Sequence, residues 1–283
     1  MSANAISKFL PEDFDRKQTA ALLAGKGEYP KIAAEKMRAL SIPLKLVAFE
    51  GETNPELEDS FAESDRVRIN VGQLGRLLKA LGKFGAKYAM MAGQITPKKL
   101  FRGMTPDLKA ALILARLKRR NAETIFGAIA DEMSKIGVEM LDGRSFLDEC
   151  VAQEGLLCGG SWKIKPEHLE HALTIARECA RLDIGQSCVT AGGTVLAVEG
   201  FEGTDKMIER CAQFEAKNAL FTKTVKPNQD YRFDVPVIGE RTIRKLAQAG
   251  IKNAAIEAGK VIVLDAPAVF ELARKNGISI FGA

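Results

Sequence analysis

Short apolar segments alternate with helical segments along most of this chain, and this alternation constrains its fold more than any other feature. An apolar run at residues 20–24 precedes a glycine loop and an alanine-rich helical segment, and a second apolar run follows at 44–49. Residues 73–84 then carry leucines at the i, i+3, i+4 and i+7 spacing of one helix face. This strand–helix order predicts a parallel, doubly wound sheet.

The first half of the chain is therefore predicted to be a Rossmann-like α/β domain, at residues 18–150. A further buried strand at 88–92 ends at Gly93, and Thr105 is the expected N-cap of the next helix. Residues 1–17 precede the first strand, and we expect them to form a tail or a packing extension.

The second half is predicted to be a distinct α/β domain with mixed strand directions, at residues 163–283. Residues 151–162 lack periodicity and contain three glycines, so we expect a linker there. A helix begins at Pro166, and Gly192-Gly193 joins two short apolar runs in a pattern typical of a β-hairpin.

Composition and charge limit the class of protein. Hydrophobic residues make up 46% and charged residues 27% of the 283 residues, which is typical of a soluble globular protein and excludes a disordered or fibrous chain. The net charge of +5 fits an anionic substrate, a membrane surface or simply a solvated surface. Nucleic-acid binders concentrate more positive charge, so we expect no nucleic-acid partner.

The cysteines and the hydropathy pattern predict a cytoplasmic protein. The five cysteines are odd in number and scattered, so we expect reduced thiols. The sequence has no run of about 18 apolar residues, and acidic residues stand where a signal peptide needs an apolar core. A lipid substrate would be met from the cytosolic side.

A glycine loop after the first strand is the first candidate site. Gly25 and Gly27 let the backbone approach a ligand, and the next helix offers N–H groups to phosphate. Pro30 stands where a dinucleotide fingerprint needs its third glycine, and the loop has no G-K-[ST] motif, so neither standard nucleotide motif is present. The alternatives are a nucleotide contact and a tight turn. Gly93 and Gln94 occupy a second strand-to-helix junction of the kind that binds ligands.

The densest polar cluster, residues 223–239, is the second candidate. Asp230, Arg232 and Asp234 alternate, so an extended segment would point all three side chains to one side. Paired carboxylates suit a hard divalent cation, and the interleaved cations suit phosphate oxygens. The alternative is an exposed loop with ordinary ion pairs.

A third set of polar residues could complete a pocket around the second. It comprises Gln186 within residues 181–186, Glu199, Thr204 and Asp205. The alternative for Thr204 and Asp205 is capping of the helix that they begin. His168 and His171 are the only histidines and are expected to point away from their helix's apolar stripe, so we expect no metal site there.

The pattern K-x-x-K-P-x-Q-D-x-R-x-D-x-P-x-I-G at residues 223–239 resembles a signature of the LpxI family of UDP-2,3-diacylglucosamine diphosphatases. Other segments are similar to the family in the same order, so that the resemblance covers residues 19–283. They are L-A-G-K-G-E-Y-P at 23–30, M-A-G at 91–93 with Pro97, R-L-D-I-G-Q at 181–186, Glu199, and E-G-T-D at 202–205.

The resemblance implies hydrolysis of UDP-2,3-diacylglucosamine to UMP and 2,3-diacylglucosamine 1-phosphate (lipid X), with Mg²⁺ or another divalent cation. It implies two α/β domains with a substrate chamber between them, and a lipid-linked substrate reached at the cytoplasmic face of the inner membrane by a peripheral protein. Asp234 matches the family's critical aspartate. A homodimer is a further expectation for the partners.

From this resemblance and the residue chemistry we assign expected roles. Asp234 binds Mg²⁺ or positions the attacking water, Asp230 supports it as second metal ligand, and Lys226 and Arg232 neutralise phosphate oxygens. The expected substrate-binding residues are Gly25, Gly27, Gly93, Gln94, Gln186, Thr204, Asp205, Lys223 and Gln229. Two alternatives remain: a diphosphatase or transferase acting on another sugar nucleotide, and a non-catalytic nucleotide-binding regulator.

Overall fold

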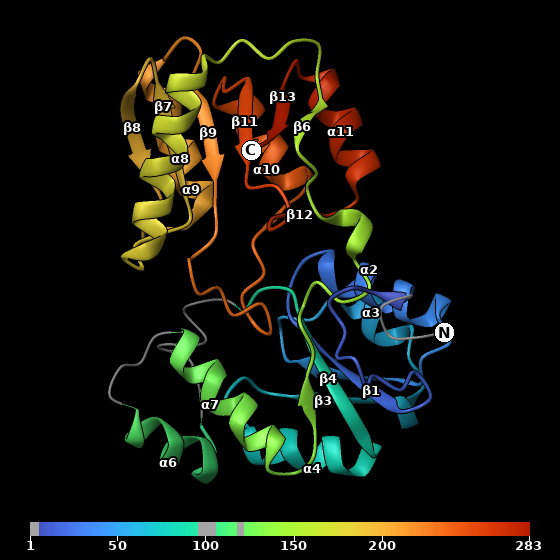
Figure 1. The fold of residues 1–283 in the computed structure, drawn as a ribbon. Coiled ribbons are helices and arrows are strands. Elements are labelled where there is room, and N and C mark those ends of the chain that lie inside the picture. Colours follow the sequence, from blue (N-terminus) through green and yellow to red (C-terminus); the bar gives the residue numbers. More distant parts are fainter. Residues whose placement is uncertain (1–5, 96–105, 118–121) are drawn as a thin grey trace. The chain divides into compact units, whose positions relative to one another are not determined.

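The structure is a computed structural model that describes residues 6–95, 106–117 and 122–283. The chain divides into two compact units (Figure 1). The first comprises Met1–Asp148 together with Asp230–Asp234, and the second comprises Glu149–Gln229 together with Val235–Ala283. No helix within the described ranges is long and apolar enough to cross a bilayer.

The first unit contains a five-stranded sheet in which every pairing is parallel. Its order is β3-β2-β1-β4-β5, which is the strand order of a doubly wound Rossmann-type sheet and confirms the predicted fold class. The strands are β1 (Thr19–Ala24), β2 (Leu44–Phe49), β3 (Arg66–Ile69), β4 (Ala86–Ala92) and β5 (Glu139–Met140).

The helices of the first unit follow its strands in sequence. They are α2 (Tyr29–Ala39), α3 (Pro55–Asp59), α4 (Leu74–Phe84), α6 (Leu108–Arg116) and α7 (Ala122–Ser134). The predicted leucine stripe is confirmed, because Leu74, Leu77, Leu78 and Leu81 of α4 are all buried in the core. Burying each leucine contributes about 1.5–3 kcal/mol, and this explains why the helix lies on the sheet.

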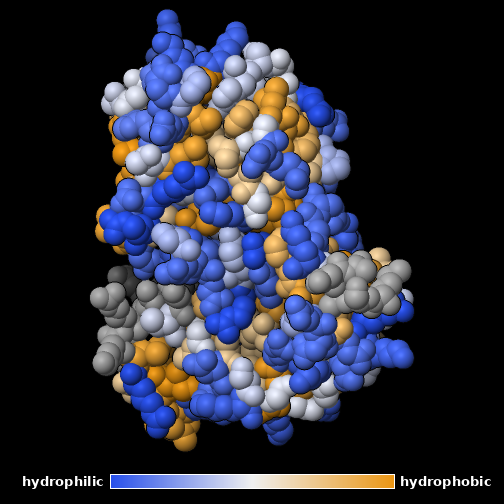
Figure 2. Space-filling model, viewed as in Figure 1, coloured by the Kyte–Doolittle hydropathy of each residue, from blue (hydrophilic) through white to orange (hydrophobic). Residues whose placement is uncertain are grey.

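The start of α6 differs from the prediction. Its N-cap is Asp107, whose carboxylate accepts a hydrogen bond from the Ala110 amide at 2.9 Å. Thr105, the predicted cap, lies outside the described residues. Leu108 and Leu112 of α6 are 77% and 53% exposed, and Figure 2 shows a hydrophobic area in the part of the view that α6 occupies.

Residues 6–17, from the predicted N-terminal extension, pack onto the first unit. The Phe14 ring lies 4.6 Å from the Tyr88 ring and 5.9 Å from the Phe146 ring, measured between centroids. The Asp15 amide donates to the Tyr88 hydroxyl at 3.0 Å. This part of the extension therefore belongs to the core of the unit.

The second unit contains a six-stranded mixed sheet, in the order β6-β13-β11-β9-β7-β8, which confirms the predicted mixed α/β domain. β9, β11 and β13 are parallel, whereas β6, β7 and β8 each pair antiparallel with a neighbour. The strands are β6 (Gly155–Cys158), β7 (Ser187–Ala191), β8 (Thr194–Val198), β9 (Leu220–Lys223), β11 (Asn253–Ile256) and β13 (Ser279–Gly282). β10 (Val237–Ile238) and β12 (Ile262–Val263) form a separate parallel pair.

The structure can be compared with two sequence predictions for this unit, a hairpin and a linker. The Gly192-Gly193 hairpin is confirmed, since β7 and β8 pair antiparallel on either side of it. Residues 151–162, the expected linker, contain β6, which pairs with β13 at the edge of the sheet. The helices of the unit are α8 (Pro166–Arg181), α9 (Thr204–Cys211), α10 (Glu240–Gln248) and α11 (Ala266–Lys275).

Candidate functional site

Several polar side chains that the sequence singled out in the second unit lie near the carboxyl end of β9, which is paired with the carboxyl end of β11. Because β9 and β11 are parallel, Lys223 and Ile256 lie at the same end of the sheet, where both strands terminate. β7 is antiparallel to β9, so its first residue, Ser187, pairs with Lys223 at that end. In α/β sheets, ligand sites form outside the carboxyl ends of the parallel strands.

A chain of hydrogen bonds joins four side chains at this end of the sheet. The Ser187 hydroxyl donates to the Glu199 carboxylate, and the Thr204 hydroxyl donates to the same carboxylate at 2.8 Å. The ammonium of Lys223, which is 7% exposed, lies 3.4 Å from the Thr204 hydroxyl oxygen. The structure thus brings Lys223 and Thr204 together.

The capping interpretation of Thr204 and Asp205 is wrong. The N-cap of α9 is Gly203, which has no side-chain hydrogen bond, and the Thr204 hydroxyl points to Glu199. Asp205 forms an ion pair with Arg241, which joins α9 to α10.

A second set of contacts organises the loop that follows β9. The Gln186 amide group donates to the side-chain oxygen of Gln229 at 2.9 Å, and the Lys226 backbone amide donates to that oxygen at 3.1 Å. The Lys226 ammonium forms an ion pair with Asp183. Gln186, Lys226 and Gln229 therefore lie together, although Gln186 is 43 residues from Gln229 in the sequence.

Glu257 also lies at this end of the sheet, and the sequence pattern did not single it out. It is 5% exposed and lies between Arg177 and Lys260, at 3.2 and 2.9 Å. Its other carboxylate oxygen accepts the Val225 amide at 3.1 Å, so it fixes the backbone where the chain leaves β9. The only available signal was its position directly after a buried strand.

The segment with Asp230, Arg232 and Asp234 belongs to the first unit, and it is not extended. It forms a turn in which the amides of Phe233 and Asp234 both donate to the Asp230 carbonyl, at 3.4 and 3.1 Å. The alternation expected of a strand is therefore wrong here.

Tyr231 holds this turn against the rest of the first unit. Its carbonyl accepts a hydrogen bond from the Gly143 amide at 2.7 Å, and its ring lies under the Arg144 guanidinium at 3.4 Å. The neighbouring Phe233 ring stacks on Phe126 with centroids 5.9 Å apart. The turn is thus fixed by a backbone contact and two ring contacts.

Asp230 and Arg232 form a bidentate ion pair within the turn. The Arg232 Nε donates to Asp230 Oδ1 at 2.9 Å, and the Arg232 Nη2 donates to Asp230 Oδ2 at 2.6 Å. These hydrogen bonds hold the pKa of Asp230 below its ordinary value of 3.8, and they raise the pKa of Arg232. Asp230 is therefore ionised at neutral pH, and it orients the guanidinium.

The two glycine loops of the first unit pack backbone to backbone. Lys26 and Gln94 exchange both backbone hydrogen bonds, at 2.8 and 3.2 Å. A Cβ atom on Gly25 would lie 2.7 Å from the Gln94 carbonyl oxygen, and one on Gly93 would lie 2.5 Å from that of Lys26. Gly27 has a φ of +92°, which favours glycine. Close packing thus explains Gly25 and Gly93, and Pro97 lies outside the described residues.

Asp230 and Asp234 would suffice for a magnesium ion only if water and a substrate supplied the remaining ligands of that ion. The described ranges contain no group of three or more His, Cys, Asp or Glu side chains placed to hold a metal. Asp230 and Asp234 supply two carboxylates, and Asp230 already accepts from Arg232. Mg²⁺ commonly uses one or two carboxylates and completes its shell with water and substrate phosphates, which matches this set.

Comparison with known proteins identifies the family. A family model of the LpxI N-terminal domain matches residues 19–150, and a model of the LpxI C-terminal domain matches residues 153–281. UDP-2,3-diacylglucosamine pyrophosphatase LpxI of Caulobacter vibrioides (strain ATCC 19089 / CIP 103742 / CB 15) is 32% identical over 275 residues, which cover 92% of this chain and 96% of that protein. The chain belongs to the LpxI family.

Proposed function

We propose that this protein hydrolyses the diphosphate of UDP-2,3-diacylglucosamine to UMP and 2,3-diacylglucosamine 1-phosphate, as a step of lipid A biosynthesis. The observation that carries the proposal is the match to both LpxI domains over almost the whole chain, together with the activity that the name of the Caulobacter relative states. The charges of residues 223–234 support it.

Cleavage of a diphosphate requires that negative charge on the phosphoryl oxygens be neutralised as the bond to the leaving group breaks. In this proposal Lys226 and Arg232 supply positive charge to those oxygens, and Lys223 contributes from the end of β9. Asp183 and Asp230 hold two of these cations through ion pairs, so the side chains are oriented before substrate binds.

Asp234 is proposed to activate or position the attacking water, because it matches the critical aspartate of the LpxI signature. Asp234 and Asp230 would also hold Mg²⁺ or another divalent cation together with the diphosphate. Such an ion supplies Lewis-acid stabilisation of the developing phosphate charge. Gly25, Gly27, Gly93 and Gln94 are proposed to contact the nucleotide, and Gln186, Thr204, Asp205 and Gln229 the remainder of the substrate.

The decisive assay incubates purified protein with UDP-2,3-diacylglucosamine and Mg²⁺ in ¹⁸O-labelled water, with products identified by mass spectrometry. We expect UMP and the sugar 1-phosphate, and the position of the label identifies the phosphorus that water attacks. Asp234→Asn should lower turnover by at least about 100-fold, in the range typical of lost acid–base or electrostatic catalysis. Asp59→Asn is the matched control, because Asp59 is a 74%-exposed carboxylate of the same unit.

The same assay separates the alternatives. A non-catalytic regulator would bind the nucleotide and release no UMP. An enzyme for another sugar nucleotide would cleave UDP-N-acetylglucosamine as well as it cleaves the diacylated substrate. Flotation with vesicles tests the proposed peripheral binding to the cytoplasmic face of the inner membrane, and sedimentation tests the proposed homodimer.

A further inference from the structure

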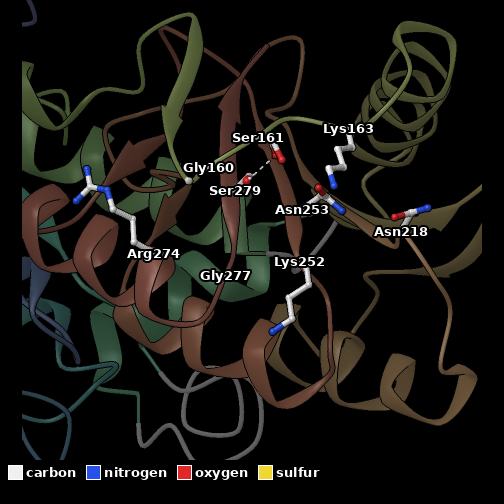
Figure 3. Close-up of a pocket in the computed structure, with 10 residues that line it drawn as sticks. Gly160, Ser161, Lys163, Asn218, Lys252, Asn253, Arg274, Gly277 and Ser279 are labelled. Atoms are coloured by element: carbon white, nitrogen blue, oxygen red, sulfur yellow. Dashed lines mark hydrogen bonds between the residues drawn. The ribbon is translucent and has the colours of Figure 1, made fainter.

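A polar pocket lies at the end of the second unit's sheet where the parallel strands β11 and β13 begin (Figure 3). Asn253 is the first residue of β11 and Ser279 the first of β13, whereas Lys223 is the last residue of β9 and lies at the opposite end of the sheet. A four-residue strand is about 13 Å long, so the pocket is separated from the candidate functional site by the sheet.

The pocket has a volume of about 610 Å³. Its lining consists of three cations, four neutral polar residues and three glycines: Lys163, Lys252, Arg274, Asn218, Asn253, Ser161, Ser279, Gly159, Gly160 and Gly277. This volume lies within the range of small-ligand sites, about 300–1,000 Å³. None of these ten described lining residues is acidic, so the pocket attracts anions.

Two of the cations are available to a ligand. Lys163 and Arg274 form no ion pair with any residue in the described ranges, and Lys252 donates to the Asn276 carbonyl at 2.8 Å. Figure 3 shows Lys163, Asn218 and Asn253 on one side of the pocket and Arg274 on the opposite side. A ligand on the first side would therefore meet an ammonium and two amide groups, whereas the Arg274 side chain is directed away from them in this view.

The walls of the pocket are fixed by close backbone packing. Gly159 has a φ of +105°, and a Cβ atom there would lie 2.7 Å from the Cα of Ser279. The Ser279 hydroxyl donates to the Ser161 carbonyl at 3.0 Å, and Asn253 is 8% exposed and donates to the Ala219 carbonyl. The pocket is thus a built feature of the fold, and only its cations lie on long side chains.

We propose that this pocket binds a phosphate group. The Lys163 ammonium can recognise phosphate through charge-assisted hydrogen bonds, amide N–H groups of Asn218 and Asn253 supply neutral donors beside it, and Lys252 and Arg274 add positive charge to the pocket. The proposal concerns a second site and does not depend on the hydrolysis proposed above. The phosphate could belong to a soluble phosphorylated molecule or to the headgroup of an anionic phospholipid.

The only tryptophan of the chain is adjacent in sequence to two lining residues of this pocket. Trp162 stands between the lining residues Ser161 and Lys163, and its ring stacks on Phe281 with centroids 4.8 Å apart. Inorganic phosphate should therefore change the Trp162 fluorescence in a saturable way, while chloride at the same ionic strength should not.

The test compares two double variants that remove the same charge. Lys163→Ala with Arg274→Ala removes two pocket cations, and Lys165→Ala with Lys275→Ala removes two nearby cations outside the lining. We expect phosphate to bind at least about tenfold more weakly to the first pair, and normally to the control pair. Thermal unfolding without phosphate verifies that both pairs fold, and hydrolysis of the nucleotide substrate should be unchanged in both.

The second arm identifies the source of the phosphate. Co-flotation with phosphatidylglycerol vesicles, and not with phosphatidylcholine vesicles, that is lost in the pocket pair alone would identify a lipid headgroup. Binding of inorganic phosphate without such flotation would identify a soluble ligand. The proposal is overturned if wild type shows neither response, if chloride reproduces the signal, or if the pocket pair responds like the control pair.

Discussion

The guanidinium of Arg144 lies over the ring of Tyr231, 3.4 Å from the ring centroid. The same guanidinium lies 4.2 Å from the Phe9 ring centroid and forms an ion pair with Asp142 at 2.7 Å. Arg144 thus joins the N-terminal residues of the first unit to a turn encoded 87 positions later, since 231 − 144 = 87. That turn carries both aspartates of the proposed catalytic set.

Removal of the Tyr231 ring should loosen this turn. A cation–π contact contributes about 0.5–2 kcal/mol, so Tyr231→Ala should lower thermal stability and turnover together. We expect kcat to fall by at least about tenfold, because misplaced catalytic groups lose that much rate. Tyr231→Phe keeps the ring and its contact with Arg144, so it should lose less stability and turnover than Tyr231→Ala. Wild-type turnover in Tyr231→Ala would show that the contact does not position the turn.

Two glycines of the first unit should respond oppositely to alanine. Gly25→Ala forces a Cβ to within 2.7 Å of the Gln94 backbone, and overpacking of this kind costs about 1–3 kcal/mol. Gly82→Ala lies within α4 with nothing within 4 Å, and it should stabilise the helix by about 0.5–1 kcal/mol. Urea unfolding measures both changes. Equal changes would contradict the packing described for the two glycine loops.

The ion pair between Asp230 and Arg232 predicts a defined acid response. Arg232 lowers the pKa of Asp230 below 3.8, so the pair's contribution is fully present above that pH and is lost as the pH falls through the lowered pKa. Arg232→Gln should therefore raise the pKa of Asp230, which ¹³C NMR of the carboxyl group measures. The difference in unfolding free energy should be constant from neutral pH to about pH 5 and then shrink.

A control distinguishes this pair from general surface charge. Arg244→Gln removes a guanidinium that pairs with Glu240, and it should leave the titration of Asp230 unchanged. Arg232 is 44% exposed, so solvent screening limits the pair's contribution to about 0.5 kcal/mol. If Asp230 titrates at the same pH in Arg232→Gln as in wild type, the ion pair does not form in solution.

The cysteines should react in a set order. Burial raises the pKa of Cys188 to about 12, and Cys150, Cys158 and Cys211 are also buried. Cys179 alone among the five is partly exposed, so iodoacetamide should modify it first. Peptide mass spectrometry after a short native reaction measures the order. Early modification of Cys188 would show that α8 opens from the sheet, since the Cys188 thiol lies at the Ala172 carbonyl.

The parallel sheet of the first unit was predictable because each strand and helix carries its own local pattern. The leucine spacing of α4 and the two glycines between β7 and β8 each determine a local structure that tertiary contacts then leave in place. β6 was not predictable in this way. It has four residues at the edge of the sheet, and its pairing with β13 depends on a strand more than 100 positions later.

Some features of the candidate site were likewise predictable from the sequence, and others were not. The sequence predicted that Gln186 and Thr204 could complete a pocket around the cluster that begins at Lys223, and the structure brings Lys223 to Thr204 and Gln186 to Gln229. It could not identify Glu257, because a single acid after a strand has no distinctive spacing. The turn at Asp230–Asp234 was misjudged because alternating charges suggest an extended segment, whereas contacts with Gly143 and Arg144 determine its conformation.

The place of Asp230–Asp234 within the first unit has a consequence for dissecting this protein. Neither unit is a single continuous piece of polypeptide, because the chain passes from one to the other after residues 148, 229 and 234. A gene cut near residue 150 would give a first fragment without its last turn and a second fragment carrying five residues that pack elsewhere. Autonomous expression of the first unit therefore calls for a graft of residues 230–234, or for a peptide supplied in trans.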